Sequence, residues 1–283
     1  MAEKPLGPRP VFRRVFAPLS ALTMVLASGG IAYAASLDVS GETLNFGADS
    51  GNEQTSKIGQ DVGVGFSHRY EDVATIGGTT FDAIATVVEV ENLDSDDDQS
   101  DGADNLIDEL DDDSSSGREI DLDIDVFGDS SVPELETGYA KVRLDFVADD
   151  TSSPVTLENV EILVEDVDKR QYVAFSGPSS YELASDSRLR VSNEGSEYEF
   201  REPDGTGCDT GCVDPEKNWV VVKYDSLSSI TLTAGARESG GASFAFSFAA
   251  ASWTGEPDLT DVPLSVYTLS YEANGADCGS VPA

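Results

Sequence analysis

The chain has 283 residues, with 17 Lys and Arg against 54 Asp and Glu, so its formal net charge is −37 at pH 7. A surface this acidic repels nucleic acid and anionic lipid, which excludes both as expected partners. Such a charge suits either high salt, which screens the self-repulsion, or a calcium-rich medium, and the composition does not decide between them.

The N-terminal segment 1–35 is predicted to be an export signal. Basic residues precede an apolar run over 15–31, and the small-residue sequence AYAA at 32–35 offers a cleavage site. The pair Arg13-Arg14 resembles the core of a twin-arginine signal, so export follows either that route or the ordinary Sec route. A proline and a glycine pair interrupt the apolar run, which is too short and broken for a membrane span. We therefore expect a secreted or cell-surface protein with no integral span in its mature chain.

Residues 36–252 are predicted to form one β domain, because nearly every periodic segment alternates apolar and polar residues. Each such segment places one face on a core and the other in water. Polar turn residues separate the segments, and no helix of a dozen residues is indicated. The fold class is therefore all-β, an antiparallel β-sandwich of jelly-roll-like form. The alternating segments are 81–90, 122–126, 140–146, 160–164, 220–224, 230–232 and 244–248.

The segment 93–117 interrupts this pattern with eleven acidic residues and no basic one. Self-repulsion and low apolarity predict an extended or disordered acidic loop between two strands, with at most one helical turn at 106–110. With Gly102 at the sixth position of an EF-hand loop, Asp104 falls where an apolar residue belongs, so the match is poor. Weak calcium capture and a merely solvated loop both remain open.

A sharper calcium hypothesis concerns Glu165, Asp166 and Asp168 at a predicted strand end. Two carboxylates in an Asp-x-Asp pattern share one side of a strand and repel each other unless a cation or hydrogen bonds intervene. We predict that these three residues bind calcium together with Asp149, or with Asp150, from the neighbouring turn. The alternative is that the aspartates cap a turn. Calcium is the only cofactor that the sequence suggests.

The three cysteines fit an exported protein. Cys208 and Cys212 lie four residues apart between predicted strands, and we predict a small local disulfide between them. A metal site would need further ligands at suitable spacing, and the surrounding sequence offers none. Cys278 is left over, and its partner would lie beyond the end of this chain.

Enzymatic chemistry is not indicated. The only histidine, His68, lies on a predicted strand, and the sequence contains no Gly-x-Ser-x-Gly elbow to hold a nucleophile. Carboxylates are too numerous for counting to single out a glycosidase pair. Aromatic residues offer an alternative, a sugar-stacking platform on one face of the sandwich. The competing interpretation is that most of these aromatic residues pack in the core or at its rim. The candidate members are Trp219, Trp253, Tyr70, Tyr172, Tyr181 and Tyr198.

The C-terminal part is predicted to be modular. Residues 253–263 are rich in Gly, Pro, Asp and Thr and are expected to form a linker. In 264–283, alternating residues lead to Asn274-Gly275, the signal of a hairpin whose second arm is missing. This stretch resembles the opening of the Listeria–Bacteroides (internalin B-type) repeat, a β-grasp-like module of bacterial surface proteins. The resemblance implies a truncated repeat module and a chain that is the front part of something longer.

A second resemblance covers part of the main domain. This part is similar to β-sandwich modules of secreted bacterial proteins, and the similarity implies a fold and a location but no activity. We therefore expect a non-enzymatic extracellular or cell-surface structural or adhesion module that binds an unidentified extracellular ligand, glycan or protein. The alternative is a carbohydrate-binding module, or the accessory domain of a secreted glycoside-active enzyme. The resemblance rests on Gly138-Tyr139, Phe146-Val147, 154–160 and 164–168.

Overall fold

The computed structural model describes residues 36–46, 59–94, 104–110, 119–128, 137–205 and 214–262. The predicted export signal, the Cys208–Cys212 disulfide, Cys278 and the repeat-like segment 264–283 lie outside these ranges and stay predictions. Within the described ranges the only helical element is the single 3-10 turn η1 (Pro215–Asn218). Accordingly, this part of the chain contains no helix long and apolar enough to cross a membrane.

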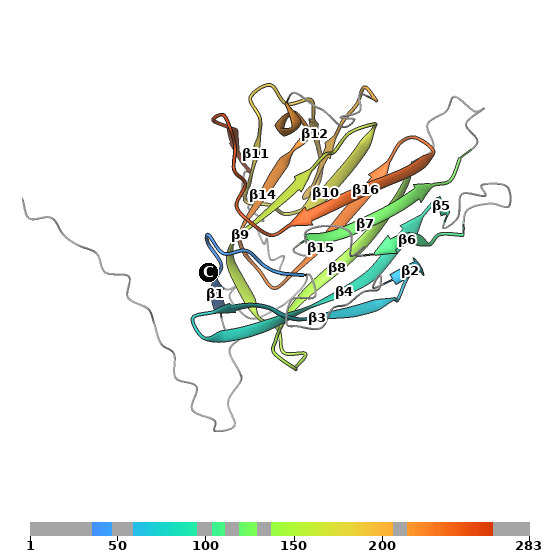
Figure 1. The fold of residues 1–283 in the computed structure, drawn as a ribbon. Coiled ribbons are helices and arrows are strands. Elements are labelled where there is room, and N and C mark those ends of the chain that lie inside the picture. Colours follow the sequence, from blue (N-terminus) through green and yellow to red (C-terminus); the bar gives the residue numbers. More distant parts are fainter. Residues whose placement is uncertain are drawn as a thin grey trace, which may run out of the picture. The chain divides into compact units, whose positions relative to one another are not determined.

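Two β-sheets make up the described fold (Figure 1). In spatial order the first contains β17 (Asp258–Asp261), β11 (Ser180–Leu183), β14 (Val220–Leu227), β9 (Thr156–Glu165), β16 (Gly240–Ser247), β7 (Glu119–Val126), β6 (Ile107–Leu110) and β2 (Gly59–Val62). In the same sheet β1 (Ser36–Asp38) pairs with β9, and β5 (Leu93–Asp94) pairs with β7. The second contains β12 (Arg190–Glu194), β13 (Glu197–Arg201), β10 (Gln171–Ser176), β15 (Ser229–Ala236), β8 (Gly138–Ala148), β4 (Thr79–Glu91) and β3 (Ser67–Ile76).

The predicted antiparallel sandwich is confirmed. Among the described strands every pairing is antiparallel except that of β1 with β9. The two sheets touch where β7 meets β8 and where β15 meets β7 and β16, so their inner faces share one apolar core. This arrangement follows from the alternating sequence, since a sheet with one long apolar face must bury it against another layer.

Aromatic rings connect the two layers through that core. Phe246 of β16 and Phe175 of β10 belong to opposite sheets, and their ring centroids lie 6.2 Å apart. Phe248, which follows β16, lies 6.1 Å from Phe146 of β8. Burying each such ring stabilises the fold by roughly 1.5–3 kcal/mol. The sandwich is therefore a rigid support for the loops at its ends.

Two expectations about the connecting segments need revision. Within the acidic segment 93–117, residues 107–110 form strand β6, so the predicted helical turn there is wrong. The backbone of β6 pairs with β2 on one side and β7 on the other, which satisfies polar groups that a lone helical turn would leave unpaired. Likewise, part of the predicted linker 253–263 is strand β17, which pairs with β11 over four residues.

Candidate binding groove and the predicted cation residues

Of the residues predicted to bind calcium at the end of β9, Asp168 begins a tight turn. The backbone N–H of Gln171 donates to the carbonyl oxygen of Asp168 at 2.7 Å, and the Gln171 side chain accepts from the Asp168 N–H at 3.1 Å. The two central residues, Lys169 and Arg170, have φ values of 46° and 66°, as in a type I′ turn. These bonds use backbone groups of Asp168 and the Gln171 side chain, so they do not test whether the aspartate carboxylates cap the turn. Calcium binding at Glu165, Asp166 and Asp168 stays a prediction.

The electrostatics at this end of β9 are those of crowded carboxylates. The pKa of Glu165 is raised, mainly by burial and then by the negative charges of Glu119 and Asp166. Asp166 has a left-handed backbone with φ of 58°, and Asp168 is buried at 5% exposure. Both aspartates make further interactions within the protein. A cation here would therefore compete with contacts that already exist.

The structure does not bring Asp149 to this turn. Asp149 follows β8 and precedes β9, whereas Glu165 is the last residue of β9. Because a strand rises ~3.3 Å per residue, the length of β9 separates the two by about 30 Å. The four residues predicted as one calcium site therefore lie at opposite ends of one strand.

Asp149 instead joins a cluster that the sequence did not predict. Single carboxylate oxygens of Asp72, Asp82 and Asp149 all lie within 4.8 Å of one another. Asp82 is fully buried, and its Oδ2 lies 2.7 Å from Nη1 of Arg69. We call Arg69 together with these three aspartates the Asp82 cluster. The pKa of Asp149 is raised by desolvation and then by the charges of the neighbouring aspartates.

The contacts of Asp82 show what this cluster does. Its carboxylate accepts the backbone N–H of Asp72 at 3.0 Å and that of Asp150 at 3.1 Å. Asp72 lies in a register shift between β3 and β4, and Asp150 lies in the turn between β8 and β9. Arg69 also donates to the carbonyl oxygen of Thr151 at 2.7 Å. One ion pair, buried on its Asp82 side, thus joins a β-bulge to a hairpin turn, which is a structural role.

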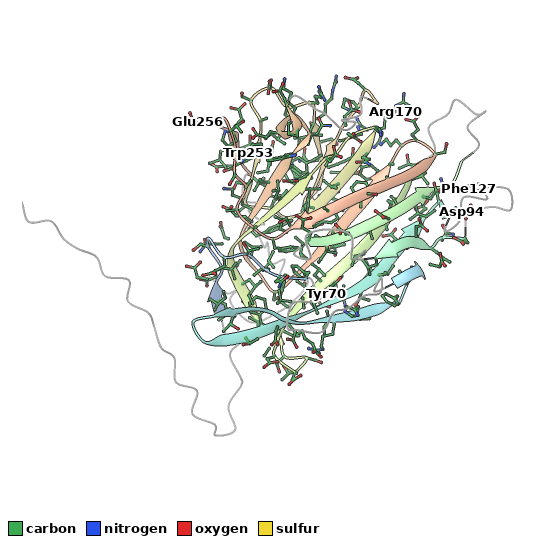
Figure 2. The ribbon with its side chains drawn as sticks, viewed as in Figure 1. Tyr70, Asp94, Phe127, Arg170, Trp253 and Glu256 are labelled. Atoms are coloured by element: carbon green, nitrogen blue, oxygen red, sulfur yellow. The ribbon has the colours of Figure 1, made fainter. Side chains whose placement is uncertain are left out.

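An open groove of about 300 Å³ lies at the other end of β9, away from the Asp82 cluster. Three segments form its walls: 184–186 after β11, 214–217 at the start of η1, and 253–257 just before β17. In Figure 2 the labelled Trp253 and Glu256 lie side by side at this end of the fold, in agreement with their shared place in the groove wall. We call this feature the end groove.

Trp253 is held in a defined orientation. Its indole N–H donates to Oε2 of Glu182 at 3.1 Å, and Glu182 in turn pairs with Lys223 at 2.7 Å. The ring of Trp219 lies 5.9 Å away at an interplanar angle of 51°. Trp253 is half-buried and lines the end groove. These are the only tryptophans in the chain.

The polar groups of the end groove are also fixed by internal contacts. Nζ of Lys217 lies 2.7 Å from Asp186 and 3.2 Å from Asp214. The hydrogen bond to Asp186 raises the pKa of Lys217, and the same bond lowers the pKa of Asp186. Thr254 donates to both oxygens of Glu216, from its backbone N–H at 2.8 Å and its hydroxyl at 2.9 Å. The groups are therefore set before any ligand arrives.

The six aromatic residues of the proposed platform do not share one surface. Tyr70 and Tyr172 are buried at 4% and 6% exposure. Tyr181 and Tyr198 contact each other at 6.2 Å between centroids, and Tyr181 packs on the buried Phe200. Of the six, Trp253 lines the end groove, and Trp219 contacts the Trp253 ring. His68 lies on β3 as expected, with its pKa lowered by burial and its ring 4.9 Å from Tyr70.

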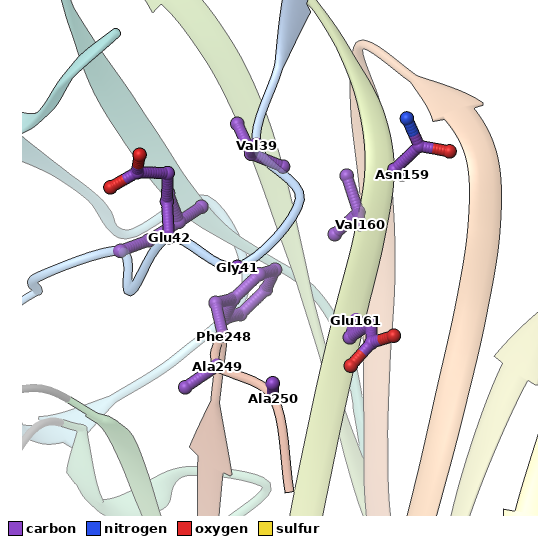
Figure 3. A pocket seen from close by; sticks show the side chains of 10 residues that line it. Val39, Gly41, Glu42, Asn159, Val160, Glu161, Phe248, Ala249 and Ala250 are labelled. Carbon is purple, nitrogen blue, oxygen red and sulfur yellow. The ribbon is translucent and has the colours of Figure 1, made fainter. Parts of the chain in front are cut away.

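A second hollow is too small to hold a ligand. It lies where 39–44 approaches β9 and the residues after β16, with Phe248 in its wall (Figure 3). Its volume is about 10 Å³, roughly that of one water-sized probe. The end groove, by contrast, has room for a small molecule.

Comparison with known proteins assigns the chain to no family. No family model matches the chain, and no curated protein matches it. Among solved structures, the N-terminal domain of the Streptococcus gordonii adhesin Sgo0707 is similar at 12% identity with a TM-score of 0.48. The match covers 76% of this chain and 65% of that one. A likeness of this strength carries no argument about function, and the sandwich assignment rests on the strand pairings.

Proposed function

We propose that the chain is a non-enzymatic extracellular or cell-surface module with a structural or adhesive role, and that it holds an extracellular ligand in the end groove. The observation that carries this proposal is an open volume of about 300 Å³ whose aromatic and polar walls are already fixed by contacts within the protein. Preorganised walls lower the entropic cost of holding a ligand, which favours binding.

The groove walls are anchored to the sandwich. The backbone N–H of Val167, just after β9, donates to the carbonyl oxygen of Asn218 at 3.1 Å. The carbonyl oxygen of Lys217 accepts the N–H of Arg188 at 2.9 Å and the hydroxyl of Ser187 at 3.0 Å. These bonds tie η1 to β9 on one side and to the segment after β11 on the other. A ligand in the groove therefore transmits force directly to the sandwich, as an adhesive module requires.

The proposal is tested by attachment of coated beads. Beads that carry the purified chain are passed over bacterial cell walls, mucin and extracellular-matrix proteins, and the retained fraction is counted. We expect retention on at least one surface, and loss of that retention with Trp253→Ala. The matched control is Tyr198→Ala, which removes a half-buried aromatic ring from β13 in the other sheet.

Three results would contradict the proposal. Retention that is unchanged by Trp253→Ala would show that the end groove is not the attachment site. Retention on none of the surfaces would remove the adhesive role. Hydrolysis of any polymer on these surfaces by the purified chain would contradict the non-enzymatic part.

A further inference from the structure

We propose that the ligand of the end groove is an uncharged carbohydrate, which stacks on Trp253 and exchanges hydrogen bonds with the carboxylates around Lys217. This assignment rests on the proposed binding function of the groove and names the ligand class. It follows from three properties of the walls: a fixed aromatic ring, an ammonium group that is already bound, and an excess of negative charge.

The aromatic wall selects a ligand with an apolar face. The indole N–H of Trp253 is used by Glu182, and Trp219 packs against the ring. What Trp253 offers a ligand is therefore the surface of its ring and not its hydrogen-bond donor. A sugar ring carries C–H groups on one face and hydroxyl groups around its edge. Such a ligand can pack on an indole while its hydroxyls reach polar groups nearby.

The polar wall disfavours a cationic ligand. Asp186 and Asp214 could bind an amine, but Lys217 already lies between them at 2.7 and 3.2 Å. Both oxygens of Glu216, a third carboxylate of the groove, already accept hydrogen bonds from Thr254. Hydrogen bonds to both aspartates raise the pKa of Lys217, so this ammonium stays charged at neutral pH. An incoming cation would have to displace an ammonium group that the chain itself supplies.

The same wall disfavours an anionic ligand. Four carboxylates line the end groove against one ammonium group, so a phosphate, sulfate or acidic sugar would enter a region of like charge. The four are Asp186, Asp214, Glu216 and Glu256.

An uncharged polyhydroxyl compound matches what remains. Its hydroxyls can donate to carboxylate oxygens, and hydrogen bonds to an ionised acceptor are stronger than those between neutral groups. Each oxygen of Glu216 already accepts one bond from Thr254, yet a carboxylate oxygen has a second lone-pair direction for a ligand. Lys217 can donate its third N–H to a hydroxyl oxygen. Hydrogen-bond donors and acceptors that the protein holds in place thus line the same groove as one aromatic ring.

The size of the groove limits the ligand to a short sugar. Small-molecule sites in proteins occupy roughly 300–1,000 Å³. At about 300 Å³ the end groove lies at the lower limit of that range. We therefore expect it to take a terminal or short saccharide unit.

Tryptophan fluorescence tests the assignment, because Trp253 lines the end groove and Trp219, the other tryptophan of the chain, contacts its ring. The probes are the methyl glycosides of glucose, galactose, mannose and N-acetylglucosamine and their short oligosaccharides. Choline and glucuronate serve as the cationic and anionic comparators. We expect at least one neutral sugar to change the emission saturably at millimolar concentration, and we expect neither charged probe to do so.

Two variants assign the signal to one ring. Trp219→Phe leaves Trp253 as the only reporter and is expected to keep the response. Trp253→Ala leaves Trp219 as the reporter and is expected to weaken sugar binding by about tenfold or more, as truncation of a central aromatic anchor does. The thermal midpoint of each variant is measured first, so that a misfolded sample is not counted.

The assignment is overturned if no neutral sugar changes the emission, if only choline or glucuronate does, or if Trp253→Ala responds like the unaltered chain. Bead attachment separates this failure from failure of the proposed function. Attachment that depends on Trp253 without any sugar response would leave the binding function in place and remove the ligand class. Loss of both would remove the function itself.

Discussion

The two ends of β9 carry polar groups that do different things. At one end the Asp82 cluster buries a carboxylate completely and surrounds it with Arg69 and two backbone N–H groups. At the other end, internal bonds fix the walls of the end groove but leave about 300 Å³ open between them. Polar contacts that leave no open space between them thus stabilise the fold. The same kinds of contact around an open volume instead hold the walls of a binding site in place.

Removing the central carboxylate of the Asp82 cluster should destabilise the fold more than any other change proposed below. Asp82→Ala leaves Arg69 and two backbone donors without their acceptor. Removing one partner of a buried ion pair costs about 3–5 kcal/mol, and we expect the lower value because the Arg69 side chain keeps 29% exposure. Urea unfolding measures the loss. The matched control is Asp145→Ala, which breaks the exposed pair of Asp145 with Arg143 and should cost about 1 kcal/mol or less. Equal losses in the two variants would refute the structural role of the Asp82 cluster.

Thermal melting in the presence of calcium tests whether either end of β9 binds a cation. If Glu165, Asp166 and Asp168 form a weak extracellular-type site, with a Kd of about 10⁻⁴–10⁻³ M, then about 10 mM calcium stabilises the fold by roughly 1.4–2.7 kcal/mol. Thermal melting with calcium and with EDTA measures the gain. Asp166→Asn should abolish it, and Asp149→Asn should leave it intact because Asp149 lies at the other end. An unchanged midpoint in calcium would end the calcium proposal. Loss of the gain only in Asp149→Asn would move the ion to the Asp82 cluster.

The turns that bound β9 also differ in their backbone chemistry. Both contain residues with positive φ, Asp150 at one end and the pair Lys169-Arg170 at the other. Aspartate tolerates this conformation, whereas lysine pays a steric cost that glycine avoids. We expect Lys169→Gly to stabilise the fold by about 0.5–1 kcal/mol in urea unfolding, and Asp150→Gly to be nearly neutral. A loss of stability in Lys169→Gly would show that contacts of the lysine side chain stabilise the fold by more than its left-handed backbone conformation destabilises it.

The smallest effect concerns pH. Burial, helped by Glu119 and Asp166, raises the pKa of Glu165 above its unfolded value, so the fold favours the protonated form. The contribution of Glu165 to stability is then full below the unfolded pKa of about 4.3 and is lost as pH rises through the folded pKa. Glu165→Gln should therefore stabilise the chain at pH 7 by a few tenths of a kcal/mol after solvent screening, with no gain at pH 4. A gain that is the same at both pH values would contradict this cause.

Local patterns in the sequence predicted the strands well, because side-chain alternation is a property of each segment alone. β7, β8, β9, β14 and β16 all fall where apolar residues alternate. The pairing of β9 with β14, and the parallel pairing of β1 with β9, join residues far apart in the chain and left no local signal. β6 was missed because its backbone partners, not its side chains, decide its conformation.

The sites were harder to predict than the fold. The Asp82 cluster draws on three separate segments, and its one sequence signal is Asp82 itself, a charged residue inside the apolar run FDAIA. A charge there must be buried with a partner or must interrupt the strand. For the end groove, the sequence indicates both tryptophans as candidate binding residues but predicts a sheet face as the position of Trp253. Residues 253–257 lie at the groove because β17, which follows them within the predicted linker, pairs with β11.

The most direct test of the central claim measures bead attachment and thermal midpoint on the same sample of Trp253→Ala. The account predicts that attachment drops to the level of uncoated beads while the midpoint stays within about 4 °C of the unaltered chain, since the ring belongs to the open end and not to the core. Full attachment by a folded Trp253→Ala sample would contradict the claim that the end groove is where this module meets its ligand.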